Sequence, residues 1–417
     1  MGQQSRPLKV LFLHQNFPGQ FKHLAPALAA AGHEVHALLL SNKPGVQWQG
    51  VKVHTYFPHR SSTHGLHPWL IDVEAKVIRG EAVLHWAMQF KQQGFTPDVV
   101  IAHPSWGESL FIKQVWPQTR LGLFYEMLYQ STGQDVHFDP EFSKPEISPG
   151  SRLMVKNAIA FLQHPSVDAA ISPTHWQAQT YEPFMREKIT VVHDGIDTLA
   201  IRPDPQARLV LDNGLAWTRA DEVLTFVSRN LEPYRGYHVF MRMLPKLLRL
   251  RPGLQVLIVG GDGVSYGAKP PQGKTWKQLF IDEVRADIAD SDWQRVHFLG
   301  RLPYPQFLTM LQISRLHVYL TYPFVLSWSL IEAMSSGCAI VASDTAPVRE
   351  AIEDGVSGRL LPFFDVDAWV QGIHRLMDDP IERQRLGDNA RQQAVERYDL
   401  RTVCLPRQLA WVNALAQ

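Results

Sequence analysis

The chain has 417 residues, 45% hydrophobic and 19% charged, so it can bury a large core and is not a disordered protein. Such a length predicts two domains of about 200 residues each. Its 41 basic and 40 acidic side chains give a formal net charge of +1, which offers no overall field that would favour nucleic acid. Two widely separated cysteines, Cys338 and Cys404, exclude a disulfide framework and a thiolate zinc site.

Apolar runs are short throughout the chain. The first, Val10 to Leu13, is too short for a signal sequence, and none approaches the ~20 residues of a membrane span. We therefore expect a cytoplasmic protein. A basic helix predicted near 237–251 leaves peripheral contact with the inner face of the membrane as an alternative to a plain solvated face. Its cations are Arg242, Lys246, Arg249 and Arg251.

Residues 8–40 predict a strand, a loop, a helix and a second strand, the opening of a Rossmann-like unit. The loop lacks the GxGxxG spacing, which disfavours a dinucleotide site. Gly19 in this loop permits either a close approach of the backbone to a ligand or an ordinary turn.

Two polar side chains follow predicted strands of the first half directly. His103 follows the strand Val99 to Ala102, and Glu126 follows the strand Leu121 to Tyr125. The carboxyl ends of parallel strands meet at one edge of a sheet, where ligands bind. His103 is thus predicted to face a ligand or to cap a loop carbonyl, and Glu126 to act as a base, to bind an acceptor or to be an ordinary loop carboxylate.

Other acids and histidines of the chain suggest metal sites that we disfavour. His59, His64 and His67 lie in an irregular loop without helical spacing or an accompanying acid. Asp365 and Asp367 form a DxD triplet immediately before a helical pattern, where an aspartate caps the helix. The stretch 191–205 loses all periodicity and gathers Gly and Pro, which predicts the domain boundary.

The second half begins with the predicted strand Val223 to Ser228. Arg229 and Arg235 flank the strand-to-helix loop that follows it, and Gly236 permits the turn into the helix. Two guanidinium groups in such a loop suit a diphosphate, because each can donate paired charge-assisted hydrogen bonds. A salt-bridged structural pair is the alternative.

The stretch 298–344 predicts two successive strand-helix units of a parallel sheet. The loop Thr321 to Ser329 leaves the carboxyl end of one strand and leads into a helix that starts near Trp328. The free N–H groups and the dipole of that helix favour a phosphate at its N-terminus.

Several motifs in this order resemble those of the retaining GT4-type glycosyltransferases, also called group 1 glycosyltransferases. They are VSRNLEPYRG, FLGRL, SLIEAMSSGCAIVASD, PVREAIEDGVSGRLL and, at the linker, VHDGIDTLAIRPDP. The resemblance covers nearly the whole chain and is strongest from Val223 to Leu361. It implies an α/β fold of the GT-B type, with two facing Rossmann-like, doubly wound domains. The implied ranges are 1–200 for an acceptor-side domain, 201–395 for a nucleotide-sugar donor domain and 396–417 for a helix returning to the first domain.

The resemblance also implies roles for individual residues. Arg229 and Arg235 match the basic pair that binds the donor diphosphate, and Glu332 matches the acid that binds the nucleotide ribose. His103 matches a histidine near the reacting sugar. Gly300, Arg301 and Leu302 fall where the family holds the base, and Gly19 matches a loop glycine near the phosphates. At the start of the helix, Ser327, Trp328 and Ser329 are further candidates for binding the donor.

The chain departs from the family pattern at one position. The first acid of the E-x7-E motif should stand at residue 324, which is Phe324 here. In the family this acid contacts donor-sugar hydroxyls, so the sugar must be held differently, and Ser327 and Ser329 are candidates. Loss of activity is the alternative, against which the intact arginine pair argues.

The resemblance implies transfer of a sugar from a nucleoside-diphosphate sugar to an acceptor hydroxyl with retention, without a cofactor or metal. The acceptor could be a carbohydrate, a lipid-linked intermediate or a small molecule. A GT-B sugar-nucleotide epimerase and a non-catalytic sugar-nucleotide-binding protein are the alternatives. A periplasmic binding protein is disfavoured by the missing secretion signal, and a nicotinamide dehydrogenase by the missing glycine fingerprint.

Overall fold

The computed structural model describes residues 6–143 and 146–417 and divides into two compact units. The first unit comprises 1–131, 146–195 and 401–417, and the second comprises 132–145 and 196–400. Both are layered α/β folds built on a mainly parallel sheet, as the alternation of strand and helix patterns predicts. Three features differ from the expected ranges: the second unit begins at residue 196, it continues to residue 400, and it also includes a segment that the sequence places inside the first half.

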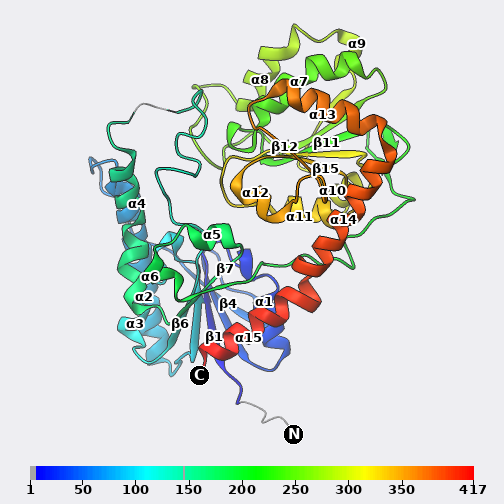
Figure 1. Cartoon of the computed structure of the whole chain (residues 1–417). Helices are drawn as coiled ribbons and strands as arrows, with labels where there is room; N and C mark the ends of the chain where they lie inside the picture. Colours follow the sequence, from blue (N-terminus) through cyan, green and yellow to red (C-terminus); the bar gives the residue numbers. More distant parts are fainter. Residues whose placement is uncertain (1–5, 144–145) are drawn as a thin grey trace. The chain divides into compact units, whose positions relative to one another are not determined.

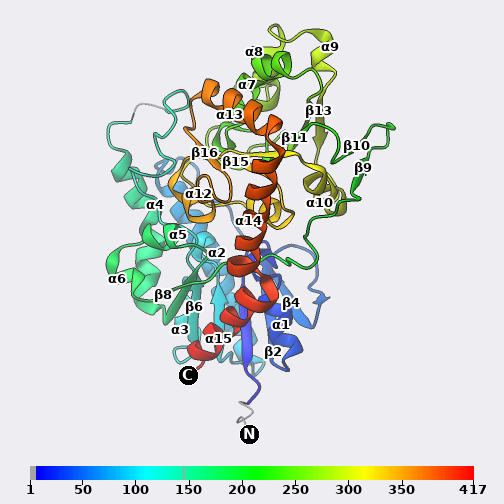
Figure 2. The same ribbon diagram turned by 45° about the vertical axis from the view of Figure 1, so that its right-hand side comes forward.

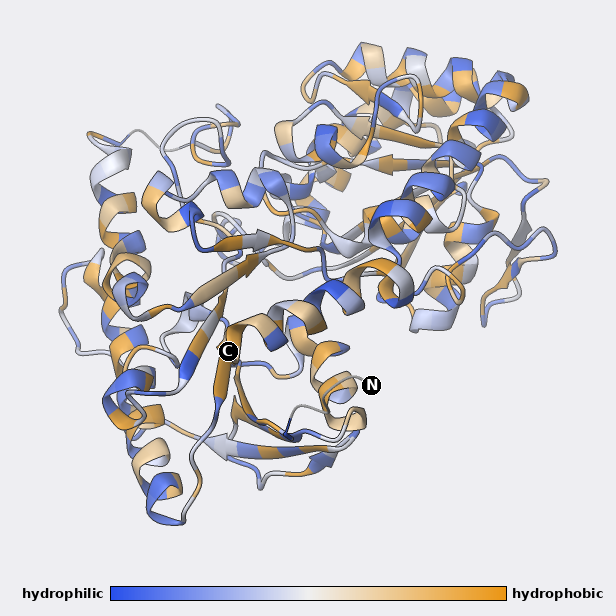
Figure 3. Ribbon diagram, turned by 60° about the horizontal axis from the view of Figure 1, so that its bottom comes forward, coloured by the Kyte–Doolittle hydropathy of each residue, from blue (hydrophilic) through white to orange (hydrophobic). Residues whose placement is uncertain are grey.

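The first unit is built on one eight-stranded sheet. Its strand order is β3-β4-β2-β1-β5-β6-β7-β8, and all neighbours are parallel except β3 and β4. The strands are β1 (Lys9–Leu13), β2 (Glu34–Leu40), β3 (Gln47–Trp48), β4 (Val51–Tyr56), β5 (Val99–Ala102), β6 (Arg120–Phe124), β7 (Ala169–Ser172) and β8 (Ile189–Val191). Figure 3 shows strands of this sheet in the colour of hydrophobic residues, consistent with a sheet covered on both faces.

Helices cover both faces of this first sheet. The α-helices are α1 (Leu24–Ala30), α2 (Leu70–Gln92), α3 (Ile112–Val115), α4 (Pro149–Gln163), α5 (His175–Gln179), α6 (Pro183–Arg186) and α15 (Leu405–Leu415). Short helical turns are η1 (Gly19–Phe21), η2 (Pro104–Trp106) and η3 (His164–Ser166), and η5 (Leu400–Cys404) precedes α15. Residues of α1 and α15 pack on one face, and residues of α2 and α3 on the other. On β6, a side chain at Gly122 would collide with Trp411 and Leu415 of α15, so a glycine lets this helix lie close to the sheet.

The second unit has a six-stranded, all-parallel sheet of order β13-β12-β11-β14-β15-β16. The strands are β11 (Val223–Asn230), β12 (Gln255–Gly261), β13 (Val296–Gly300), β14 (Leu316–Tyr319), β15 (Ile340–Ser343) and β16 (Arg359–Leu361). A separate hairpin of β9 (Arg208–Val210) and β10 (Ala216–Thr218) contacts the helix α10 (Tyr304–Ile313) (Figure 2). The observed β14, α11 and β15 confirm the strand-helix-strand order predicted for 316–343.

Helices also cover both faces of the second sheet (Figure 1). They are η4 (Pro233–Arg235), α7 (Tyr237–Leu250), α8 (Trp276–Arg285), α9 (Asp290–Trp293), α10 (Tyr304–Ile313), α11 (Trp328–Ser335), α12 (Ala346–Ala351), α13 (Val366–Asp378) and α14 (Pro380–Tyr398). One core joins the sheet to α7, α8 and α13, and the other joins it to α10, α11, α12 and α14. Burial of these two apolar faces is the main stabilising contribution.

The cations of α7 do not form an unpaired basic face. Arg242 contacts Glu141 and Glu283, Lys246 contacts Asp367, and Arg251 contacts Glu222 and Asp378. Arg249 donates to the carbonyl of Asp287. Across the described ranges, the structure also has no helix that combines the length and apolarity needed to cross a bilayer.

Candidate functional site

The carboxyl edge of the second sheet holds a buried arginine in a fixed orientation. Arg235 ends η4 and is 8% exposed. Its guanidinium donates to Thr321 Oγ1 at 2.7 Å and to the carbonyl of Val325 at 3.1 Å. Both acceptors belong to the loop after β14, so this loop holds the cation in place. Gly236 follows with φ +67°, and any side chain there would collide with Leu320, so the turn into α7 requires glycine.

Two further arginines lie at the same edge. Arg229 is exposed and is the penultimate residue of β11, so the strand continues two residues beyond its predicted end. Arg301 follows β13, is exposed, and donates to Asn230 Oδ1 at 3.4 Å. The same sheet edge therefore carries cations at the ends of β11 and β13, with β12 between these two strands, an arrangement suited to a polyanion.

The N-terminus of α11 lies in the loop after β14. Ser327 is the N-cap residue, and its Oγ accepts from Ser329 N–H at 3.3 Å and from Ser329 Oγ at 2.9 Å. The backbone N–H of Ser327 donates to the hydroxyl of Tyr319 at 3.0 Å. Trp328, the first helical residue, is half-buried. The first turn of α11 thus begins beside the loop that holds Arg235, where its dipole favours negative charge.

Glu332 lies in the second turn of α11 and is 7% exposed. Its Oε1 accepts from the hydroxyl of Tyr304 at 2.6 Å. Burial and the Glu332 carboxylate raise the pKa of Tyr304, so this tyrosine stays protonated and donates. Tyr304 starts α10 two residues after the half-buried Leu302, and Gly300 (φ +62°) makes the turn between β13 and α10. The contact of Tyr304 with Glu332 was not predicted from the sequence.

Phe324 is buried at 6% exposure and does not project into open space. Its ring packs on Tyr234 (5.3 Å between centroids) and Tyr266 (4.9 Å), and the Arg235 guanidinium carbon lies 5.7 Å from the ring centre. Phe324, which stands where the E-x7-E motif has its first acid, is thus part of an aromatic cluster around Arg235.

The corresponding edge of the first sheet carries two histidines and a carboxylate. His103 follows β5 and is fully buried, with its Nδ1 accepting from Ser105 N–H at 3.3 Å. Its Nε2 lies 3.6 Å from Glu126 Oε2, which is beyond hydrogen-bond distance. The structure therefore brings together the two residues predicted at this edge.

His14 and Gln20 complete this group and were not predicted from the sequence. His14 Nε2 lies 2.8 Å from Gln20 Oε1, and Gln20 donates to Glu126 Oε1 at 3.3 Å. Gly19 has φ +47°, and a Cβ there would lie 2.3 Å from the His14 ring, so the loop accepts glycine alone at this position. The sequence did contain a signal for His14, because this residue follows β1 directly, as His103 follows β5.

Charges at this edge are set by burial and by neighbours. Burial, with a contribution from His103, lowers the pKa of His14 to about 4. Burial opposes ionisation of Glu126, but the contacts with His103 and His14 outweigh it and leave the Glu126 pKa below its ordinary value. At neutral pH the edge therefore presents a neutral His14 and an ionised Glu126.

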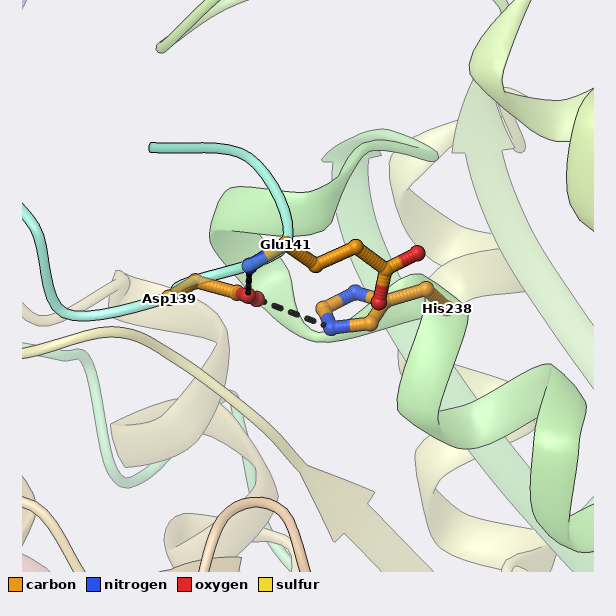
Figure 4. A group of neighbouring side chains, drawn as sticks. All are labelled: Asp139, Glu141 and His238. Atoms are coloured by element: carbon orange, nitrogen blue, oxygen red, sulfur yellow. Dashed lines mark hydrogen bonds and ion pairs between the residues drawn. The ribbon is translucent and has the colours of Figure 1, made fainter. Parts of the chain in front are cut away.

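One group of possible metal ligands is found in the part of the chain that the structure describes. Atoms of Asp139, Glu141 and His238 lie within 4.8 Å of one another in the second unit (Figure 4). The loop histidines His59, His64 and His67 do not belong to it. Asp365 caps α13 by accepting from Ala368 N–H at 2.9 Å, which confirms its predicted role as a cap.

Comparisons with known families match most of the chain in two parts. Residues 31–201 match the model described as glycosyl transferase family 4 group, and residues 215–393 match glycosyl transferases group 1. A D-inositol 3-phosphate glycosyltransferase of Nocardia farcinica is 29% identical over 204 residues, 48% of this chain and 42% of that protein. This chain thus spans less than half of that relative. A glycogen synthase of Mycobacterium tuberculosis is 26% identical over 401 residues, 91% of this chain and 87% of that protein.

Solved structures show the same fold at low identity. A sucrose-phosphate synthase from Thermosynechococcus elongatus superposes with a TM-score of 0.73 at 16% identity, covering 98% of this chain and 99% of that one. HepE of Anabaena, solved in complex with UDP-glucose, gives a TM-score of 0.65 at 16% identity, with 98% and 99% coverage. These matches confirm the predicted fold of two Rossmann-like α/β domains.

Proposed function

Because this chain belongs to the group 1 glycosyltransferases and has the GT-B fold, we propose that it transfers a sugar from a nucleoside-diphosphate sugar to an acceptor hydroxyl with retention of configuration. The observation that carries the proposal is Arg235, a buried guanidinium fixed by Thr321 and Val325. Arg229 lies in the same β11–α7 connection. The crystal structure of HepE in complex with UDP-glucose supports a donor of this class.

The proposed chemistry rests on stabilising the leaving group. Cleavage of the glycosidic bond leaves a nucleoside diphosphate, whose charge Arg229, Arg235 and the N-terminus of α11 would stabilise without reorganising. The leaving phosphate helps to deprotonate the attacking hydroxyl, so the protein supplies positioning and charge. Since permanent cations neutralise the diphosphate, the proposal needs neither a cofactor nor a metal at the donor site.

The remaining groups receive roles in the same proposal. Glu332 binds the ribose, and the backbone around Gly300, Arg301 and Leu302 holds the base. The start of α11 binds the donor sugar and phosphate in this proposal, through Ser327, Trp328 and Ser329. Gly19 lets the first-unit loop approach the donor.

In the same proposal, His103 contacts the reacting sugar and Glu126 contacts the acceptor hydroxyl. A carbohydrate, a lipid-linked intermediate or a small molecule fits this acceptor role, and transfer to it serves glycan or glycoconjugate synthesis. We propose that this takes place in the cytoplasm, with contact at the inner face of the membrane if the acceptor is lipid-linked.

The test is a donor-consumption assay with UDP-, GDP-, ADP- and dTDP-sugars in the presence and absence of acceptor mixtures and of a chelator. The proposal expects acceptor-dependent, chelator-insensitive release of one nucleoside diphosphate. NMR of the product should show the anomeric configuration of the donor. An inverted product would contradict retention.

Two other outcomes would identify the competing functions. Conversion of the donor into an isomer without an acceptor would indicate an epimerase. Tight donor binding with no turnover under any acceptor condition would indicate a non-catalytic binding protein.

A further inference from the structure

A segment of the first half of the sequence forms part of the second unit. Residues 132–143 lie between β6 and α4 in the chain, yet they pack with the second unit. Phe138 packs on Tyr322 and Phe363, and Phe142 packs on His238 and Phe280. We call residues 132–143 the acidic segment, after its carboxylates Asp135, Asp139 and Glu141.

Asp139 is the centre of the polar contacts of the acidic segment. It is 3% exposed, and its Oδ2 accepts from the hydroxyl of Tyr322 at 2.6 Å. His238 Nε2 lies 3.1 Å from the same oxygen, and Oδ1 accepts from Glu141 N–H at 3.0 Å. Figure 4 shows Asp139 and His238 pointing toward each other. Burial opposes ionisation, but His238 and Tyr322 outweigh it and keep the pKa of Asp139 below its ordinary value.

This group has the composition of a metal site, but its contacts favour another role. Both carboxylate oxygens of Glu141 accept from Arg242 at 2.7 Å. Arg242 also contacts Glu283, so an arginine already neutralises the exposed side of the group. Asp139 and His238 are left as a buried pair, with two protein ligands where a closed metal site needs about four.

The contacts of Asp139 lead to Arg235 through two intervening residues, Tyr322 and Thr321. Tyr322, held by Asp139, follows Thr321, whose Oγ1 accepts from Arg235 and in turn donates to the carbonyl of Tyr322 at 3.0 Å. The backbone N–H of Tyr322 also donates to the carbonyl of Tyr234, the residue before Arg235, at 3.0 Å. The Tyr234 hydroxyl contacts Asp135 of the same segment.

We propose that Asp139 is a positioning residue for the donor diphosphate. By fixing Tyr322 it fixes Thr321, and thereby the orientation in which the Arg235 guanidinium meets the phosphates. A segment far from Arg235 in sequence therefore sets the affinity for the diphosphate part of the donor. This inference rests on the proposed function, because it requires that Arg235 contacts the donor phosphates and adds that Asp139 helps to orient Arg235.

The test compares Asp139→Asn and Tyr322→Phe with Asp367→Asn, a control carboxylate of the same unit that is 66% exposed and pairs with Lys246. Calorimetry gives the affinity of each variant for the best-binding nucleoside diphosphate among UDP, GDP, ADP and dTDP, and for its parent nucleoside. Asp139→Asn and Tyr322→Phe should weaken diphosphate binding about tenfold and leave nucleoside binding unchanged, as expected for loss of roughly 1.4 kcal/mol at the phosphates. Asp367→Asn should behave like the wild type.

A double variant separates positioning from general destabilisation. If Asp139 acts through Arg235, adding Asp139→Asn to Arg235→Ala should cause no further loss of affinity. Equal losses in both backgrounds, or equal losses for diphosphate and nucleoside, would overturn the proposal. If Asp139→Asn does not fold, Tyr322→Phe carries the same comparison, because it removes a single hydroxyl.

Two results would point elsewhere. A stoichiometric divalent cation in the purified protein, lost on His238→Gln, would make the group a metal site and overturn the proposal. Unchanged diphosphate affinity in Arg235→Ala alone would instead refute the proposed donor contact, on which the role of Asp139 depends.

Discussion

The two sheets offer different chemistry at corresponding carboxyl edges. The second sheet carries Arg229, Arg235 and Arg301, whose planar guanidinium groups can donate paired hydrogen bonds to an anion. The first carries His14 and His103 with Glu126, side chains that can hydrogen-bond to hydroxyl groups. The same architecture thus presents cationic side chains at the sheet edge of one unit and histidines with a carboxylate at that of the other. Function follows from the side chains placed at the edge rather than from the fold.

The largest expected effect comes from removing the fixed cation of the second unit. Arg235→Ala should lower turnover on the order of a hundredfold, because it removes one preorganised donor to the leaving phosphate. Steady-state kinetics with the active donor would measure this. Arg375→Ala serves as the control, because Arg375 is an exposed arginine of α13 in the same unit. Near-native turnover would remove Arg235 from the site.

A smaller effect, of a different kind, is expected in the first unit. His103→Asn should lower turnover about tenfold, the loss of roughly one hydrogen bond to the reacting groups. Its affinity for the nucleoside diphosphate should equal that of the wild type. A tenfold loss of nucleotide affinity in His103→Asn would contradict the proposal that the second unit binds the nucleotide and that His103 acts on the reacting groups.

Glu332→Gln should weaken nucleoside diphosphate binding about fivefold, the effect of losing about 1 kcal/mol from one hydrogen bond. The amide keeps an acceptor for the Tyr304 hydroxyl, so Tyr304→Phe serves as the control for that contact. Calorimetric titration gives both values. Unchanged affinity in Glu332→Gln would argue against the ribose role.

The smallest expected effect concerns pH and the first unit. The folded-state pKa of His14, about 4, lies below the unfolded value of about 6.5, so below pH 6.5 the unfolded chain binds a proton that the folded chain does not. Stability is therefore lost as the pH falls, and lowering it from 7 to 6 should cost about 0.7 kcal/mol through His14. Chemical denaturation at the two pH values should show a smaller difference in His14→Gln. An equal difference in both proteins would contradict a neutral, buried His14.

Local pattern predicted the parts of the site that depend on strand ends and turns. His103 follows β5 directly, Glu126 lies two residues after β6, and Arg235 precedes a turn that needs Gly236, so the sequence was sufficient to place them at sheet edges. The acidic segment falls inside the range 1–200 expected for the first domain, although its partners, His238 and Tyr322, lie about a hundred residues or more away in the second unit. A polar stretch shows no periodicity that would reveal such contacts. The cluster around Phe324 was missed for a similar reason, since Tyr234 and Tyr266 reach it from separate connections.

The central claim is that the second unit binds a nucleoside diphosphate through permanent cations. Thermal unfolding of the protein with UDP, GDP, ADP, dTDP or NAD, each with and without a chelator, tests it most directly, because a ligand that binds the native state raises the melting temperature. We predict a shift from one of the nucleoside diphosphates that the chelator does not change. No shift from any diphosphate, or a shift from NAD alone, would contradict the claim.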